Sequence, residues 1–145
     1  MQEPISENSL FAMIANGKLP IPPAARLLGL KVVGAARGAV TLSFHADRAF
    51  LNPAGKVQGG MLSAMLDEAT SIAALTALDQ GKYVLTLEMK VQFIAAAREG
   101  DIRAEGRLIS LGDRIAFVEA DLIQGDVLIA KGNATLLVRT SSVLN

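Results

Sequence analysis

Residues 59–78 read GGMLSAMLDEATSIAALTAL, an uninterrupted helical pattern that ends at Asp79, Gln80 and Gly81. Apolar side chains occur around almost the whole circumference of this helix: Met61, Leu62, Met65, Leu66, Ala69, Ile72, Ala73, Leu75 and Leu78. A helix that is apolar on nearly all sides is enclosed by other parts of the fold, because no face of it gains from contact with water. We therefore expect a sheet that wraps around this helix.

Asp67 lies at the centre of a narrow stripe of small and polar residues on the helix. The residues within about 60° of it, on a wheel of about 100° per residue, are Ser63, Thr70, Ser71 and Ala74. Burial of a carboxylate is unfavourable unless the group is paired or used. Asp67 therefore bonds to these hydroxyls, faces solvent at the edge of an interface, or takes part in a reaction. Glu68 points about 100° away, so the two acids do not form a facing catalytic pair.

Alternating apolar and polar residues on both sides of the helix predict strands. Two runs within residues 30–46, separated by residues 34–38, predict a hairpin before the helix. Four more runs follow the helix, with Gly-Asp turns between the later ones: residues 85–93, 102–110, 115–123 and 127–138. This order of two strands, one long helix and four strands predicts an α+β fold with a single antiparallel sheet of six strands.

The segment before the first strand has the pattern of a cap or tether. Residues 6–15 carry an apolar stripe and predict a helix that stops at Asn16. Residues 23–28 predict a short helical turn that begins at a proline and ends at Gly29. We therefore divide the chain into three parts: an N-terminal helical cap or tether (1–28), one domain (29–140) and a C-terminal tail (141–145).

The composition of the 145 residues excludes several kinds of chemistry. The chain has no Cys and a single His, His45, so it cannot supply a cysteine nucleophile, an iron–sulfur cluster or two His ligands to a metal. We expect no metal and no prosthetic group. The 14 basic and 14 acidic residues give a net charge of +0, which argues against nucleic acid or an anionic membrane surface as the main partner.

Hydrophobic residues make up 51% of the chain and the mean hydropathy is +0.39, more than a domain of this size needs for its own core. This excess predicts an oligomer. The N-terminal residues lack the basic and apolar segments of a secretion signal, and no apolar run approaches the roughly 20 residues that span a bilayer. We expect a cytoplasmic protein without membrane segments.

The helix begins at Gly59 and Gly60, where free backbone N–H groups and the positive end of the helix dipole can polarise a carbonyl oxygen. Residues 52–60, NPAGKVQGG, and the helix as far as Asp67 resemble the signature of hotdog-fold acyl-CoA thioesterases of the phenylacetic-acid-degradation type. That family wraps a six-stranded antiparallel sheet around one long helix. It usually has His-Gly-Gly where this chain has Gln58 and the two glycines.

The resemblance covers most of the chain and implies a role for each matching residue. Gly59 donates its backbone N–H to the thioester oxygen, and Asp67 attacks the thioester carbon or activates a water molecule. Asn52 provides a polar side chain near the thioester, and Thr86 provides a hydroxyl group that helps to orient the water. We also expect four residues to bind the substrate: Gln58, Gly60, Ser63 and Ser71. An amide at position 58 forms hydrogen bonds but is neither an acid nor a base near neutral pH.

Gly59 and Asp67 are eight positions apart, which is about 12 Å along a helix. That is too far for both residues to contact one thioester group, so the site must combine Gly59 of one subunit with Asp67 of another. We therefore expect a homodimer, in agreement with the resemblance, and a homotetramer built as a dimer of dimers.

The function that follows is hydrolysis of an acyl- or aryl-coenzyme A thioester to a free acid and coenzyme A, with Asp67 as nucleophile or general base. The alternative is a non-catalytic protein that binds acyl-CoA, because Gln58 replaces the usual His. A hydratase of the same fold is disfavoured, since its usual motif with a His near a carboxylate is absent. His45 lies on the outward face of its strand and is not expected to act as a catalyst.

Overall fold

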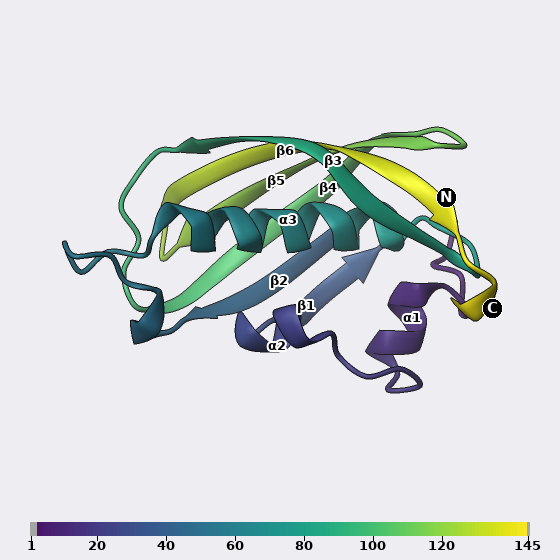
Figure 1. Cartoon of the computed structure of the whole chain (residues 1–145), viewed down its shortest axis with the longest axis horizontal. Helices are drawn as coiled ribbons and strands as arrows, with labels where there is room; N and C mark the ends of the chain where they lie inside the picture. Colours follow the sequence, from purple (N-terminus) through teal and green to yellow (C-terminus); the bar gives the residue numbers. More distant parts are fainter. Residues whose placement is uncertain (1–2, 145) are drawn as a thin grey trace.

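The computed structural model describes residues 3–144 and has one long helix inside a strongly curved sheet (Figure 1). Residues 1–2 and 145, which belong to the expected N-terminal segment and C-terminal tail, lie outside the described range. The helix is α3 (Gly59–Leu75), and the strands are β1 (Lys31–Ala36), β2 (Ala39–Ala46), β3 (Lys82–Phe93), β4 (Gly100–Leu111), β5 (Ile115–Gln124) and β6 (Val127–Thr140). The expected α+β fold, a six-stranded antiparallel sheet wrapped around one central helix, is confirmed.

The sheet packs against α3 through residues that are completely or almost completely buried. On the helix these are Leu62, Met65, Leu66, Ala69, Thr70, Ala73 and Ala74. Strand β4 approaches the helix so closely that a Cβ atom at Gly106 would lie 2.5 Å from the carbonyl oxygen of Ala69. Glycine at this position lets the backbone of the sheet contact the backbone of the helix, which fixes α3 against the concave face.

Helix α3 and helix α1 (Leu10–Ala15) are shorter than the sequence pattern predicted, and a side-chain cap fixes the shortened end of each. Helix α3 ends at Leu75 and not at residue 78, because Thr76 is the C-cap residue. Its hydroxyl group donates to the carbonyl of Ala73 at 2.7 Å and accepts from the N–H of Gly38 at 2.8 Å. Helix α1 begins four residues later than expected, since the Ser9 hydroxyl accepts from the N–H of Ala12 and caps it there.

The order of the strands differs from their order in the sequence. It is β1-β2-β4-β5-β6-β3, so β3 pairs with β6 and not with β4, and both β1 and β3 are edge strands. In the first hairpin the turn is narrower than expected, because Gly34 belongs to β1 and lies at a bulge that follows Val32. Edge strand β3 leaves apolar side chains exposed, with 51% of Leu85 and 56% of Leu87 accessible. Long apolar edges of this kind are open to pairing with another strand.

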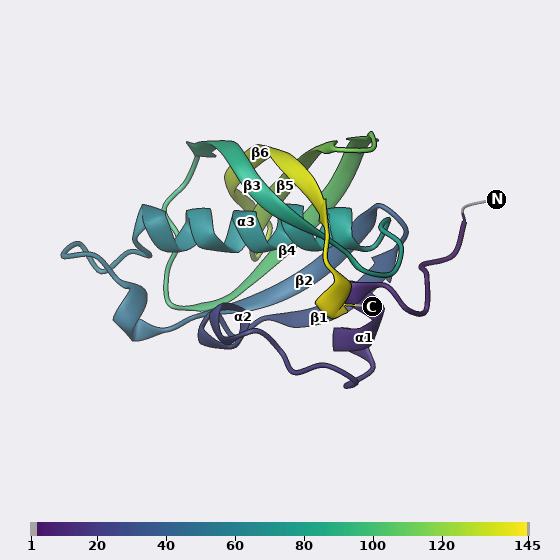
Figure 2. The same cartoon turned by 45° about the vertical axis from the view of Figure 1, so that its right-hand side comes forward.

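Helix α1 and the short helix α2 (Pro23–Leu27) lie beside β1, on the side where the sheet does not enclose α3 (Figure 2). Part of α3 is therefore reached from outside the sheet, between the two edge strands and next to the N-terminal helices. No helix within residues 3–144 is long and apolar enough to cross a membrane. His45 is exposed on β2 as expected, and its Nδ1 atom lies 2.8 Å from a carboxylate oxygen of Asp101.

Candidate active site

The start of α3 presents free hydrogen-bond donors. Gln58 is the N-cap residue, and its side-chain oxygen accepts from the N–H of Met61 at 3.1 Å. The backbone N–H groups of Gly59 and Gly60 meet no acceptor within residues 3–144. Unpaired N–H groups at the positive end of a long helix attract a carbonyl oxygen that gains negative charge during a reaction.

Both glycines at this helix start lie close to neighbouring side chains. A Cβ atom at Gly60 would lie 2.7 Å from the side-chain oxygen of Gln58, which is the atom that caps the helix. A Cβ atom at Gly59 would lie 3.2 Å from the ring of Phe93 at the end of β3. The absence of side chains here therefore keeps the cap in place and leaves the donor groups accessible.

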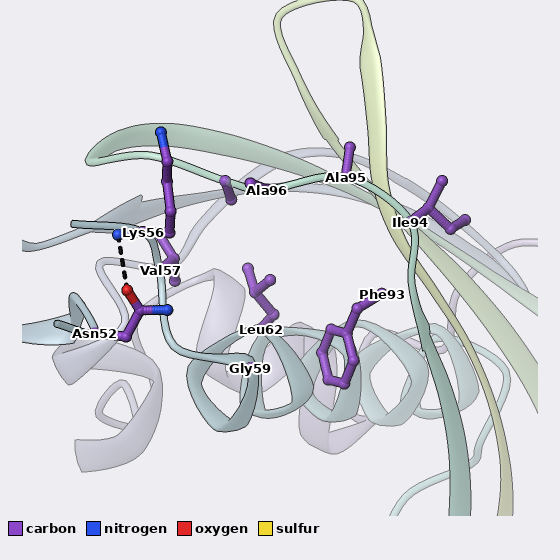
Figure 3. A pocket seen from close by; sticks show the side chains of 10 residues that line it. Asn52, Lys56, Val57, Gly59, Leu62, Phe93, Ile94, Ala95 and Ala96 are labelled. Carbon is purple, nitrogen blue, oxygen red and sulfur yellow. Dashed lines mark hydrogen bonds between the residues drawn. The ribbon is translucent and has the colours of Figure 1, made fainter. Parts of the chain in front are cut away.

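Asn52 shapes the loop that leads to this helix start. Its side-chain oxygen accepts from the N–H groups of Ala54 at 3.0 Å and Lys56 at 3.1 Å, which closes a tight turn. Figure 3 shows that its amide nitrogen points away from this turn, into a cavity of about 350 Å³ that is also lined by Gly59 and Phe93. We call the group of Asn52, Gln58, Gly59 and Gly60 the loop half of the site.

Asp67 has a partner on another element. The hydroxyl group of Thr86, on edge strand β3, donates to a carboxylate oxygen of Asp67 at 2.6 Å. Two hydroxyl groups of the polar stripe donate to backbone carbonyls and not to the carboxylate. Thr70 donates to the carbonyl of Asp67 and Ser63 to that of Gly59, each at 3.0 Å. Of the alternatives for Asp67, a bond from Ser63 or Thr70 to its carboxylate is therefore wrong, and Thr86 takes that role.

Glu68 is a site residue that the helical pattern did not reveal. With Ser71 it lines a largely apolar cavity of about 420 Å³ between α3, the N-terminal helices and β1. Burial raises the pKa of the Glu68 carboxyl group above its ordinary value, and the charge of neighbouring Asp67 raises it further. Its position on the same arc as Ile72 and Leu75 was the available signal, since that arc is covered by another element. We call Asp67, Glu68, Ser71 and Thr86 the carboxylate half of the site.

The raised pKa predicts that Glu68 destabilises the fold at neutral pH. When a carboxyl group binds its proton more tightly in the native state than in the unfolded chain, the protein loses stability as the pH rises through the pKa of the native state. Glu68→Gln should therefore raise the melting temperature at pH 7.5 by a few degrees, about 1–3 °C because the group is partly screened by solvent. The gain should disappear near pH 4, where the wild-type carboxyl group is protonated. Thermal unfolding of both proteins at both pH values measures the gain in melting temperature. An unchanged or lower melting temperature of Glu68→Gln at pH 7.5 contradicts the prediction.

The two halves lie at different places along one helix. Eight residues separate Gly59 from Asp67, and both belong to α3, so about 12 Å of helix lies between them. The free N–H groups point toward the N-terminus of the helix, which is away from Asp67. The structure brings Asp67 together with Thr86, and Asn52 together with Gln58 and Gly59, but a single chain does not unite the two groups.

The chain matches the thioesterase superfamily over residues 54–131, which include the loop before α3, the helix and most of the sheet. This match covers more than half of the chain. The protein therefore belongs to the thioesterase superfamily, and its fold is the hotdog fold of these enzymes.

Individual relatives agree with this assignment. A phenylacetic acid degradation-related protein from Ralstonia eutropha JMP134 has 34% identity and a TM-score of 0.85, over 88% of this chain and 98% of that one. Human acyl-coenzyme A thioesterase 13 is 27% identical over 76% of this chain and 81% of its own length. A variant of the phenylacetic acid degradation protein of Thermus thermophilus shares the fold, with 23% identity and a TM-score of 0.72 over 80% and 98% of the two chains. The protein is a thioester hydrolase.

Proposed function

We propose that the protein hydrolyses acyl-CoA thioesters at a site formed by the loop half of one subunit and the carboxylate half of its partner. The free N–H of Gly59 donates a hydrogen bond to the thioester carbonyl oxygen and stabilises the negative charge that develops on it. Asp67 attacks the carbonyl carbon, or removes a proton from the water that attacks it. If Asp67 attacks, the carbon–sulfur bond breaks to release coenzyme A, and water then hydrolyses the mixed anhydride on Asp67 to release the acid. If water attacks, the carbon–sulfur bond breaks in the resulting tetrahedral intermediate, the acid is released, and the proton taken by Asp67 passes to the departing sulfur.

Thr86 supports either route. Its hydroxyl hydrogen is directed to Asp67, which holds the carboxylate in place, and its oxygen can still accept a hydrogen bond from water. The two routes differ in the fate of the water oxygen, since only the covalent route transfers labelled oxygen from water into the Asp67 side chain during a single turnover.

The separation of the two halves along α3 is the observation that carries the proposal of a shared site. Gly59 and Asp67 lie at equal distances in sequence on either side of Ser63. Strand β3 runs beside the helix in the opposite direction, because Thr86 contacts Asp67 and Phe93 packs on Gly59. A two-fold axis that passes near Ser63 and the middle of β3 therefore places each loop half opposite the partner's carboxylate half.

The edge of the sheet suits this arrangement. Strand β3 has 12 residues, lies at the edge and exposes Leu85 and Leu87. Antiparallel pairing of two such strands would satisfy their free backbone groups and join the two sheets. The same pairing brings the two copies of α3 side by side, with the small Ser63 where they cross.

Mixing two inactive variants tests the shared site. Asp67→Asn disables one half and Gly59→Pro disables the other, so each homodimer has no complete site. In a mixed dimer one of the two sites carries both changes and the other is intact. Random reassembly should therefore restore about one quarter of the wild-type activity. The measurement is the turnover of co-refolded subunits, compared with each variant refolded alone.

Asp67→Asn refolded with a differently tagged copy of itself is the matched control. A mixture of the two variants that is no more active than this control, although mixed dimers form, contradicts a site that spans two subunits.

A panel of acyl-CoA esters tests the activity. Released coenzyme A is measured with a thiol reagent, and the protein adds no background because it contains no Cys. We expect turnover of at least one aryl or medium-chain ester. Tight binding of these esters without release of coenzyme A would instead show a protein that binds acyl-CoA and does not hydrolyse it.

A further inference from the structure

The cavity beside the carboxylate half is largely apolar. Phe11 and Ile14 of α1 line it together with Ile72 and Leu75 of α3. Its volume of about 420 Å³ lies within the range of pockets that hold small organic groups, which is about 300–1,000 Å³. The N-terminal helices therefore border a cavity that is large enough for an acyl group.

The cavity lies next to the carboxylate that we assign to the reaction. Ser71 lines the cavity and follows Asp67 by four residues, so the two side chains are neighbours on the same face of α3. A thioester whose carbonyl group lies at Asp67 can therefore extend its acyl chain past Ser71 into the cavity.

Glu68 is the acidic group in this cavity, and it has no hydrogen-bond or ion-pair partner within residues 3–144. Lys31 of β1 also lines the cavity, but its side chain is exposed to solvent and forms no ion pair with Glu68 among the described residues. An acid without a partner in apolar surroundings is unfavourable for folding, and such groups are typical of functional sites. Like charges repel each other, and the repulsion grows where burial lowers the local dielectric constant.

We propose that Glu68 selects the acyl group by charge, so that the cavity accepts neutral acyl chains and rejects chains that end in a carboxylate. This inference rests on the proposed thioesterase function and adds a specificity-determining residue to it. Glu68 does not touch the reacting atoms, so its effect falls on how well each acyl chain is bound.

Hexanoyl-CoA and adipoyl-CoA provide the test, because both carry six-carbon acyl chains and differ in the terminal carboxylate. Wild-type protein should prefer hexanoyl-CoA by at least about 100-fold in kcat/KM. Glu68→Gln keeps the shape of the side chain and removes its charge, and it should reduce this preference at least tenfold. The change should arise mainly from a lower KM for adipoyl-CoA.

Asp113→Asn is the control, since it removes one negative charge from an exposed turn between β4 and β5 and should leave the preference unchanged. An equal preference in wild type and Glu68→Gln overturns the inference, as does a wild type that prefers adipoyl-CoA. Calorimetric binding of the same two esters repeats the comparison without turnover. If wild type binds but does not hydrolyse them, the proposed activity fails while the binding ratio still decides the role of Glu68.

Discussion

Asp67→Asn should lower kcat/KM for acyl-CoA esters at least 100-fold. The substitution removes the negative charge that attacks the thioester or activates water, and loss of a general base or nucleophile typically costs at least this much. The amide oxygen of Asn can still accept the hydrogen bond from Thr86, whose hydroxyl group lies 2.6 Å from the wild-type carboxylate. The fold and the binding of substrate should therefore be preserved.

Steady-state kinetics measures this effect, and the melting temperature confirms that the variant is folded. Asp79→Asn is the matched control, because Asp79 is exposed just beyond α3 and its backbone, not its side chain, bonds to Lys82. The control should keep wild-type turnover. Unchanged turnover in Asp67→Asn would overturn the assignment of this carboxylate to the reaction.

Gly59→Pro should lower kcat about 100- to 1,000-fold, the range observed when one donor to a developing oxyanion is removed. Proline has no backbone N–H, and the first position of a helix tolerates it because that N–H has no partner within the helix. Gly59 is this first position, and Gln58 before it has the extended backbone, with ψ of 137°, that a following proline favours. The variant should therefore fold and lack only the donor.

Gly59→Ala distinguishes the loss of the N–H donor from the effect of the added Cβ atom. Both substitutions place a Cβ atom 3.2 Å from the ring of Phe93, so both require this ring to move slightly. Alanine retains the N–H group, and its kcat should be at least tenfold higher than that of the proline variant. Equal rates in the two variants would show that the N–H of Gly59 does not stabilise the reaction.

The repeating patterns of the sequence predicted the elements of the fold, and long-range contacts decided where several of them end. Alternation of apolar residues indicated all six strands, and the apolar circumference of residues 59–78 indicated a wrapped helix. The true end of α3 depends on Thr76, whose hydroxyl group bonds to Gly38 on a distant hairpin. The position of β3 beside β6 could not be read from the sequence, because pairing of distant strands leaves no local pattern.

The candidate site, like the fold, could be predicted only in part from the sequence. The pattern around Asp67 and the two glycines at the start of the helix were visible in the sequence. The cavity around Glu68 was not, because its other walls come from residues of α1 and β1 that are more than thirty positions earlier in the chain. Burial in this cavity raises the pKa of the Glu68 carboxyl group, and no local spacing reports that burial.

The sequence by itself determined the distance between the two halves of the site, because the rise of a helix is constant and Gly59 and Asp67 lie on one helix. It also determined that neither thiol nor paired-histidine chemistry is available, since the chain has no Cys and one His. Only the tertiary structure decided that Thr86 on an edge strand holds Asp67, and that Glu68 is the acidic group of a largely apolar cavity. Those features depend on which surfaces pack together. Packing brings together residues that are far apart in the chain, and such contacts leave no local pattern in the sequence.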